Sequence, residues 1–332
     1  MRKARIGFIG CGGIASAHAS RLATFEDVEL VAFSDVNEGR ARQMAGRYGG
    51  KHYGDWRKML EKEELDIVFI CIPPFAHQDE VMIAAENGIS IYIEKPIALD
   101  MRLAKDMVRA VEKNGVKSQV GYQFRFSFAG EKAKRMIEEG VLGRIGLVEG
   151  NYWCRFIRTD WWIDKTKSGG QLVEQSTHLV DILRWMCGEV EKVYAEMDRL
   201  FYTDVAGMTI EDTSGVVFRF KSGAIGVFSA TIGASPHEWL FSWSIIGSKA
   251  MVKSVDPTVL TVYYSASKPF RIKEYREYGR DPMKLAERDL IDAVLHDGET
   301  RTPIREGAKT LEVTLAAVKA AAEGRVVVLE DW

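Results

Sequence analysis

A glycine-rich segment directly after the first apolar run constrains this chain more than any other feature. The run Arg5–Ile9 leads into Gly10-Cys11-Gly12-Gly13-Ile14-Ala15 and then into an alanine-rich stretch. This GxGxxA pattern is typical of a strand-to-helix turn that receives a pyrophosphate. Gly10 permits the tight turn, Gly12 the close backbone approach and Ala15 the packing of helix on strand. The segment therefore predicts a βαβ unit that binds phosphate at a helix N-terminus.

An acidic residue stands where such a turn needs a partner for ribose. Asp35 follows Ala15 by 20 residues, at the end of the second apolar run. A carboxylate there accepts both ribose hydroxyls of a dinucleotide and repels a 2′-phosphate. We therefore expect bound NAD; NADP is less favoured but stays an alternative, because Arg40 lies close enough in sequence to read its phosphate. The expected contacts in this part of the chain are Gly10, Gly12, Gly13, Ile14 and Asp35.

The length and spacing of the apolar runs change along the chain and divide it into two parts. Up to about residue 120, short apolar runs alternate with amphipathic stretches, as parallel βαβ units require; the runs are Arg5–Ile9, Leu30–Ser34, Ile67–Ile72, Ile89–Ile93 and Lys117–Gly121. Later runs are longer and joined by short turns, which predicts antiparallel strands; they are Ile145–Phe156, Val190–Leu200, Asp212–Phe220, Ala224–Ile232, Trp239–Ile246 and Ala250–Val255. We predict an α/β protein with a doubly wound parallel Rossmann sheet in residues 1–123 and a second α/β domain in residues 124–332.

Charge and cysteine usage exclude several classes of protein. The 45 Lys and Arg nearly cancel the 47 Asp and Glu without a basic block, so neither nucleic acid nor a membrane surface is an expected partner. The N-terminal apolar run is too short and glycine-broken for a signal or spanning segment, which favours a cytoplasmic protein. Because Cys11, Cys71, Cys154 and Cys187 are far apart, we expect free thiols and no metal site.

Two further strand ends are expected at the cofactor. One apolar run continues into Cys71-Ile72-Pro73-Pro74-Phe75-Ala76-His77, and another into Glu94-Lys95-Pro96. Ligands of a doubly wound sheet bind at the carboxyl ends of its strands. A lysine at such an edge can exchange a proton with a substrate hydroxyl. The predicted cofactor contacts from these segments are Ile72, Pro73, His77, Glu94 and Lys95.

A polar stripe marks the helix expected over residues 171–187. Ser168-Gly169-Gly170 opens this helix, and Glu174 and His178 lie one turn apart on one face. The remaining members of the stripe are Gln171, Gln175 and Asp181. The stripe is either an ordinary solvated helix face with one histidine, or a surface that faces a substrate.

Together these motifs resemble the Gfo/Idh/MocA oxidoreductases, which are named for glucose-fructose oxidoreductase, inositol dehydrogenase and a rhizopine catabolism protein. The resemblance spans nearly the whole chain; it rests on the glycine turn, Glu94-Lys95-Pro96, Gly121-Tyr122-Gln123-Phe124-Arg125-Phe126, and Gly169-Gly170 followed by Glu174-x-x-x-His178-x-x-Asp181. It implies a Rossmann domain, then an α/β domain whose open, mostly antiparallel sheet forms subunit contacts. It also implies NAD(P)-linked oxidation or reduction of sugars, inositol-like polyols and related compounds.

The resemblance also assigns roles by position. Lys95 corresponds to the catalytic lysine and His178 to the catalytic histidine, while Glu174 stands where many polyol dehydrogenases carry Asp. We expect hydride transfer between the nicotinamide and a substrate carbinol carbon, with His178 taking the hydroxyl proton and Lys95 hydrogen-bonded to the same hydroxyl, or with these two roles exchanged. Gln123 is expected at the cofactor; the expected substrate contacts are Arg125, Trp153, Arg155, Trp162, Glu174 and His178.

Alternatives remain for the roles of single residues and for the function of the whole protein. The tryptophans and arginines can stack on and bind a sugar, or they can belong to sheet packing and a subunit interface. An uncovered sheet face predicts a homodimer or homotetramer. Two other functions are a redox-neutral sugar hydrolase or lyase that recycles a tightly bound NAD, and an NAD-binding sensor without catalysis.

Overall fold

The computed structural model describes residues 2–155, 159–233 and 239–330. Internal contacts divide the chain into two units: residues 1–123 with 283–308, and residues 124–282 with 309–332. The division after residue 123 is the one that the sequence pattern suggests. Residues 283–308, however, group with the first unit, whereas the sequence pattern placed them in the second domain.

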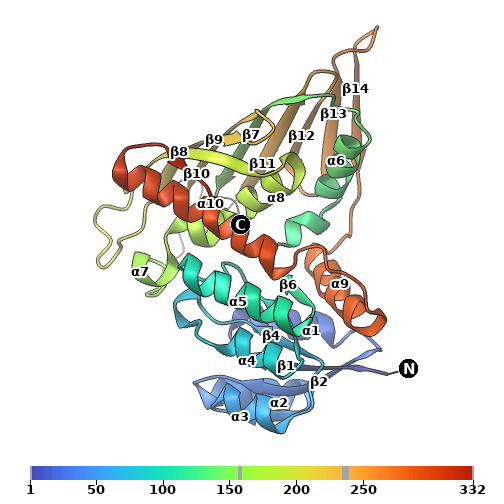
Figure 1. The fold of residues 1–332 in the computed structure, drawn as a ribbon, viewed down its shortest axis with the longest axis vertical. Helices are drawn as coiled ribbons and strands as arrows, with labels where there is room; N and C mark the ends of the chain where they lie inside the picture. Colours follow the sequence, from blue (N-terminus) through green and yellow to red (C-terminus); the bar gives the residue numbers. More distant parts are fainter. Residues whose placement is uncertain (1, 156–158, 234–238, 331–332) are drawn as a thin grey trace. The chain divides into compact units, whose positions relative to one another are not determined.

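The first unit is built on a parallel six-stranded sheet in the order β3-β2-β1-β4-β5-β6 (Figure 1). Ile6 at its centre pairs with Leu30 on one side and Ile67 on the other. The strands are β1 (Ala4–Ile9), β2 (Val28–Ser34), β3 (Lys51–Tyr53), β4 (Ile67–Ile70), β5 (Ser90–Ile93) and β6 (Ser118–Val120). The order reverses between β1 and β4, which is where ligands of such sheets bind. The predicted doubly wound sheet is confirmed, although β3 was missed.

Helices cover the sheet of the first unit. They are α1 (Gly13–Leu22), α2 (Glu38–Tyr48), α3 (Trp56–Lys62), α4 (Glu80–Glu86), α5 (Met101–Asn114) and α9 (Pro282–His296). The side chains of α1, α2 and α9 pack on one face around Phe8, Phe33, Phe69 and Tyr92. Local signals bound α5, because Asp100 accepts from the Leu103 N–H and Gly115 ends the helix with positive φ.

The second unit is built on a nine-stranded sheet in the order β14-β13-β12-β11-β7-β10-β9-β8-β15. Its neighbouring strands are antiparallel except β7 and β10. The strands are β7 (Ile145–Trp153), β8 (Val190–Asp198), β9 (Thr213–Phe220), β10 (Ile225–Thr231), β11 (Leu240–Gly247), β12 (Met251–Asp256), β13 (Val259–Tyr264), β14 (Arg271–Arg276) and β15 (Val327–Val328). The mostly antiparallel sheet is confirmed, and β13 and β14 were missed. The predicted end of β7 at Phe156 lies outside the described residues.

One face of this sheet is covered by helices. They are α6 (Phe128–Glu138), α8 (Thr177–Cys187) and α10 (Ile304–Glu323), which begins in the first unit (Figure 1). Between β7 and α8 lie the short α7 (Lys165–Ser168) and a π-turn, η3 (Leu172–Ser176). The opposite face of the sheet presents exposed apolar side chains, among them Val217, Ile225, Val227 and Leu240.

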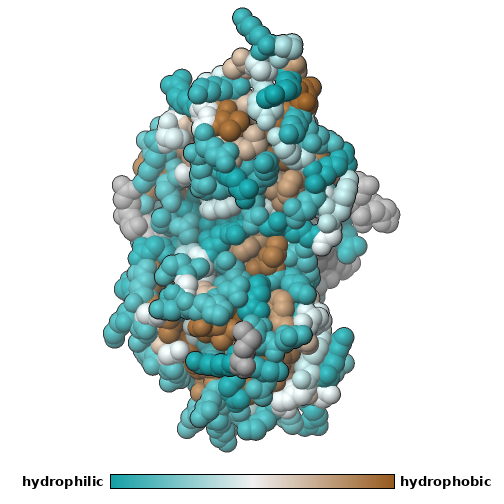
Figure 2. Space-filling model, turned by 90° about the vertical axis from the view of Figure 1, so that its right-hand side faces the viewer, coloured by the Kyte–Doolittle hydropathy of each residue, from teal (hydrophilic) through white to brown (hydrophobic). Residues whose placement is uncertain are grey.

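The surface in Figure 2 is mostly hydrophilic, with hydrophobic side chains in separate patches. Within the described ranges, no helix is long and apolar enough to cross a membrane. Apolar helix faces are instead buried against the two sheets.

A buried ion pair ties α8 to the start of the second unit. Arg125 Nε donates to Asp181 Oδ2 at 2.8 Å, and Arg125 Nη2 donates to Oδ1 at 2.6 Å. Both side chains are 1% exposed, and the Thr310 hydroxyl also donates to Asp181 at 3.1 Å. Because a buried charge without its partner is costly, this pair is expected to matter for stability.

We expect Asp181→Asn to lower the free energy of unfolding by about 3–5 kcal/mol, since the amide leaves the buried guanidinium uncompensated. The matched control is Glu112→Gln in the exposed, equally bidentate Arg305–Glu112 pair, where the loss should be under about 1 kcal/mol. Urea denaturation at neutral pH measures both variants. Equal losses would contradict the assignment of Asp181.

Candidate active site

The glycine turn after β1 has the shape that a bound phosphate needs. Gly10 has φ +90°, and a Cβ there would lie 2.4 Å from the Cys71 carbonyl oxygen, so only glycine fits. A Cβ on Gly12 or Gly13 would meet nothing within 4 Å. Helix α1 begins at Gly13 without a side-chain cap, which leaves first-turn N–H groups for an anion. These features fit a dinucleotide pyrophosphate.

Asp35 is held beside this turn by backbone groups. Its Oδ2 accepts from the Cys11 N–H and its Oδ1 from the Asn37 N–H, both at 2.8 Å. A carboxylate fixed in this way retains lone pairs for ribose hydroxyls. Burial and the neighbouring Asp35 raise the pKa of the Cys11 thiol to about 12. Cys11 therefore contributes its backbone rather than a reactive sulfur. Arg40 is exposed on the first turn of α2.

The segment after β4 carries a buried histidine whose second ring nitrogen lacks a partner among the described residues. Ile72 and Pro73 are half-buried, and His77 is buried. The His77 Nδ1 pairs with Glu80 Oε1 at 2.5 Å, while its Nε2 is buried without a hydrogen bond. Burial alone would raise the pKa of Glu80, but the hydrogen bond to His77 lowers it below its usual range. An orphaned ring nitrogen near a ligand-binding edge is a natural contact for a cofactor.

The end of β5 is shaped by Glu94. Its Oε1 pairs with His18 Nε2 at 2.9 Å, and its Oε2 accepts from the Lys95 N–H at 3.3 Å. A Cβ on Gly121 would lie 2.7 Å from Glu94 Oε1, which explains the glycine there. Lys95 is half-buried at the carboxyl edge of the sheet. Glu94 thus fixes the backbone from which Lys95 projects.

In the second unit, Glu174 and His178 each contact an aromatic side chain. Trp162 Nε1 donates to Glu174 Oε2 at 2.7 Å. The ring of His178 meets Phe124 edge-on, with centroids 5.3 Å apart, and Phe124 stacks on Phe241 at 4.1 Å. The structure thus joins Trp162 to Glu174 and places His178 against Phe124, and a substrate site shared by these side chains stays a prediction. Phe124 and Phe241 were not predicted for this site, because their ring contacts join positions that are far apart in the sequence.

The polar stripe of this helix is buried rather than solvated. Gln171, Gln175, His178 and Asp181 are buried, and Glu174 is half-buried. Gln175 accepts from the Cys154 thiol at 3.1 Å, and Gln171 Nε2 donates to the Ser176 hydroxyl at 2.8 Å. The interpretation as an ordinary solvated helix face is therefore wrong. The helix is also not uniform, since residues Leu172–Ser176 form a π-turn before α8, a feature that often marks functional sites.

The entry to this helix depends on a carboxylate that the sequence analysis missed. Gly170 has φ +104°, and a Cβ there would lie 2.6 Å from Glu211 Oε2. Glu211 Oε1 accepts from the Leu172 N–H at 2.9 Å, and Lys165 Nζ lies 3.4 Å from Glu211 Oε2. The only local signal was the Gly169-Gly170 pair, which does not reveal a partner some forty positions away.

Two predicted substrate contacts are not supported. The Arg125 side chain is buried against Asp181, so we assign it to the packing of α8. Tyr152 and Cys154 are buried on the helix-covered face, and side chains alternate along a strand, so Trp153 faces the other side. There its Nε1 donates to the Ser229 hydroxyl at 2.8 Å. Arg155 is exposed next to residues outside the described ranges, and its contact stays a prediction.

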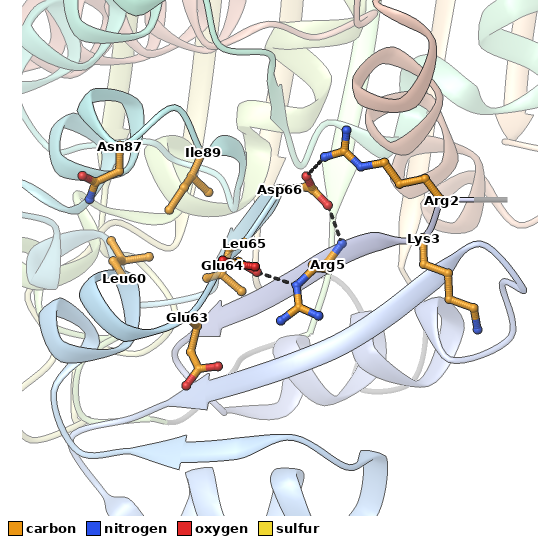
Figure 3. A pocket seen from close by; sticks show the side chains of 10 residues that line it. All are labelled: Arg2, Lys3, Arg5, Leu60, Glu63, Glu64, Leu65, Asp66, Asn87 and Ile89. Carbon is orange, nitrogen blue, oxygen red and sulfur yellow. Dashed lines mark hydrogen bonds and ion pairs between the residues drawn. The ribbon is translucent and has the colours of Figure 1, made fainter.

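A surface hollow at the amino-terminal edge of the parallel sheet is not a candidate site (Figure 3). Its charged groups bind one another: Asp66 accepts from the Arg5 N–H at 2.9 Å and from Arg2, and Arg5 Nε donates to the Glu64 carbonyl at 2.7 Å. It also lies at the edge opposite the glycine turn. Within the described ranges, no group of three or more His, Cys, Asp or Glu side chains could hold a metal ion, and the four cysteines are not in disulfides.

Comparisons with known proteins agree with this geometry. A myo-inositol 2-dehydrogenase of Thermotoga maritima is 29% identical over 339 aligned residues, covering 98% of this chain and 99% of the relative. A scyllo-inositol 2-dehydrogenase (NAD(+)) of Bacillus subtilis is 30% identical, covering 75% of this chain and 72% of the relative. A solved structure of levoglucosan dehydrogenase in complex with NADH has a TM-score of 0.91 over the whole of both chains at 23% identity, which shows a shared fold.

Family models match both parts of the chain. Residues 4–122 match the oxidoreductase family with an NAD-binding Rossmann fold, and residues 131–253 match the Gfo/Idh/MocA C-terminal domain. These matches cover well over half of the sequence, in the order in which the two sheets occur. The chain therefore belongs to the Gfo/Idh/MocA family and is an oxidoreductase with an NAD-binding Rossmann domain.

Proposed function

We propose that this protein is an NAD-dependent dehydrogenase that interconverts a secondary hydroxyl and a carbonyl on a sugar or an inositol-like polyol. One observation carries the proposal: the open, uncapped glycine turn beside Asp35 occurs in the same chain as the Trp162–Glu174 hydrogen bond and the buried His178. The first can hold a dinucleotide, and the second offers polar groups on an aromatic surface, as sugar recognition requires. The names of the inositol dehydrogenase relatives support this substrate class.

The first unit would hold the cofactor. The N–H groups of Gly12, Gly13 and Ile14 would bind the phosphates, and Asp35 the ribose. The remaining contacts proposed along the carboxyl edge of the sheet are Ile72, Pro73, His77, Glu94, Lys95 and Gln123. The nicotinamide, when bound, supplies the hydride acceptor.

The proton would be handled by two residues of this chain. His178 takes the proton of the reacting hydroxyl, and Lys95 donates a hydrogen bond to the same oxygen as negative charge develops on it. Glu174 accepts from Trp162, so it fixes the indole and offers carboxylate oxygen to substrate hydroxyls. This division of roles follows from the chemistry of the side chains and from the family resemblance.

A second candidate is a redox-neutral enzyme that oxidises its substrate transiently and returns the hydride. A panel of sugars and polyols with added NAD separates the two, because only a dehydrogenase accumulates free NADH. An NAD-binding sensor would turn over none of them, and the burial of the polar Glu174–His178 helix argues against a site that has lost its chemistry.

The cofactor proposal predicts that NAD binds at least several-fold more tightly than NADP, because the fixed Asp35 carboxylate repels a 2′-phosphate. Asp35→Ser should narrow or reverse this preference. Calorimetric titration of both cofactors measures it, with Arg42→Ala on the exposed side of α2 as the control. Stronger NADP binding that is lost in Arg40→Ala would show that Arg40 reads the phosphate.

The catalytic proposal predicts that Lys95→Ala and His178→Ala each lower turnover by roughly 10²–10⁴-fold, the usual contribution of general acid–base catalysis. The double variant should lose much less than the product of the two, since groups acting on one proton are not additive. Glu174→Gln tests whether that carboxylate takes part. The controls are Lys113→Ala and His296→Ala, both exposed; near-normal turnover in His178→Ala would refute the role of the helix.

The subunit proposal concerns the exposed apolar face of the nine-stranded sheet. Val217 and Val227 are exposed and lie directly opposite each other on β9 and β10, and such a face favours association. We expect a homodimer or homotetramer, dissociated by Val227→Lys. Light scattering at micromolar concentration measures the mass, and Leu200→Lys on an exposed loop is the control. A monomeric wild-type protein would contradict the proposal.

A further inference from the structure

A buried histidine that the proposed chemistry does not use lies between two carboxylates in the first unit. His18, on α1, pairs through Nδ1 with Glu287 Oε1 at 2.6 Å and through Nε2 with Glu94 Oε1 at 2.9 Å. The side chains of His18 and Glu287 are 0% exposed, and that of Glu94 is 13% exposed. Three ionisable groups at this depth must balance one another, because unpaired buried charge is costly.

Aromatic rings fix the position of the imidazole. Tyr92 meets His18 edge-on, with centroids 4.9 Å apart, and Phe69 lies at 5.5 Å. Tyr92 and Phe69 stack on each other at 4.5 Å. In such apolar surroundings hydrogen bonds to charged groups are strong, so the ring and its two carboxylates form a rigid link.

His18 is charged at neutral pH. Burial alone would lower its pKa, but the hydrogen bonds to Glu287 and Glu94 outweigh burial and raise the pKa to about 9. Both ring nitrogens then donate. The other titratable groups that face this cluster are Arg21, 4.0 Å from Glu287, and Tyr92 and Cys71, whose pKa values burial raises well above their usual ranges.

We propose that His18 is a positioning residue for Lys95. It holds one oxygen of Glu94, whose other oxygen accepts from the Lys95 N–H. His18 thereby joins the helix that begins at the phosphate turn to the strand end that carries Lys95, and Glu287 holds the imidazolium from α9. The inference rests on the proposed function of Lys95 and identifies His18 as the residue that fixes the position of the Lys95 backbone.

The link explains why residues from late in the chain group with the first unit. Glu287 lies on α9, whose apolar residues Leu290 and Ile291 pack in the core of the first unit. Arg288, beside Glu287, separately anchors α9 by pairing with Asp27 at 2.8 and 3.0 Å. The Arg288–Asp27 pair involves neither His18 nor Glu94. A substitution that breaks this pair therefore weakens the attachment of α9 and serves as a control for substitutions of His18.

The first experiment compares His18→Gln with Asp27→Asn. In His18→Gln we expect kcat to fall by roughly 10–100-fold, the effect of a small misplacement of a catalytic group, while the Kd for NAD measured by calorimetry changes less than about threefold. Asp27→Asn should lower the thermal midpoint without changing kcat. If the kcat of His18→Gln, counted per NAD-binding site, equals that of Asp27→Asn, His18 is only a structural residue.

A second, conservative variant covers the case in which His18→Gln does not fold. Glu287→Gln keeps a hydrogen-bond acceptor for the imidazole but removes the charge that keeps it protonated. We expect the alkaline decline of kcat to begin at least about one pH unit lower than in the wild type. An unchanged pH profile would overturn the proposal.

Two readouts do not depend on turnover. Since the pKa of folded His18 lies above that of an unfolded histidine, its stabilisation is complete below about pH 6.5 and is lost as the pH rises through about 9. The free energy of unfolding, measured by urea denaturation, should therefore fall between about pH 6.5 and about pH 9 in the wild type. This fall should be absent in His18→Gln. The rate of Lys95 carbamylation by cyanate, located by peptide mass spectrometry, should change several-fold in His18→Gln but not in Asp27→Asn.

These readouts separate the two levels of failure. If the wild type forms no NADH with any sugar or polyol, the proposed function fails, and the carbamylation of Lys95 still tests the positioning. An unchanged carbamylation rate in His18→Gln would refute the inference even if the enzyme proves to be a dehydrogenase.

Discussion

The close approach of Gly10 to the Cys71 carbonyl oxygen is the constraint on which the first unit depends. Strands β1 and β4 are neighbours at the point where the strand order reverses, and a side chain at Gly10 would clash with Cys71 and Ile72, directly after β4. The turn can therefore pass close to the neighbouring strand and start α1 with its N–H groups unobstructed. The bonds from Asp35 to the Cys11 and Asn37 N–H groups then hold the acidic residue at the same turn. The proposed phosphate and ribose contacts rest on this steric requirement and on these two hydrogen bonds.

The second unit depends on a different feature, a buried helix that carries a stripe of polar side chains. Three members of its polar stripe have a protein partner: Asp181 has Arg125, Gln175 has Cys154, and Glu174 has Trp162. Glu211 satisfies the N–H of Leu172 at the start of the helix. Satisfied buried polar groups give a rigid arrangement, which suits a helix proposed to present a proton acceptor. His18 in the first unit follows the same principle, with two carboxylates as its partners.

The sequence pattern was sufficient to predict a strand or helix where the apolar run or the end residues that mark it lie within a few positions. Strands β1, β2, β4 and β5 follow from apolar runs, and α5 from Asp100 and Gly115 at its ends. Strand β14 has nearly all of its residues exposed and offers no alternation to detect, whereas β13 carries the Val and Tyr residues of a strand and was predictable. The π-turn at Leu172–Ser176 has no simple sequence signature, so the predicted uniform helix was only approximately correct.

The sequence by itself determined the turn, the acidic residue twenty positions later and the order of the two domains, because each depends on local spacing, while the catalytic candidates Lys95 and His178 came from the family resemblance. The tertiary structure decided which polar groups meet. Glu94 and Glu287 are 76 and 269 positions from His18, and Arg125 is 56 positions from Asp181. It also decided which face of β7 carries Trp153, since a strand shows alternation but not which side is covered. Pairings over such separations are set by how sheets and helices pack, and local spacing carries no record of them.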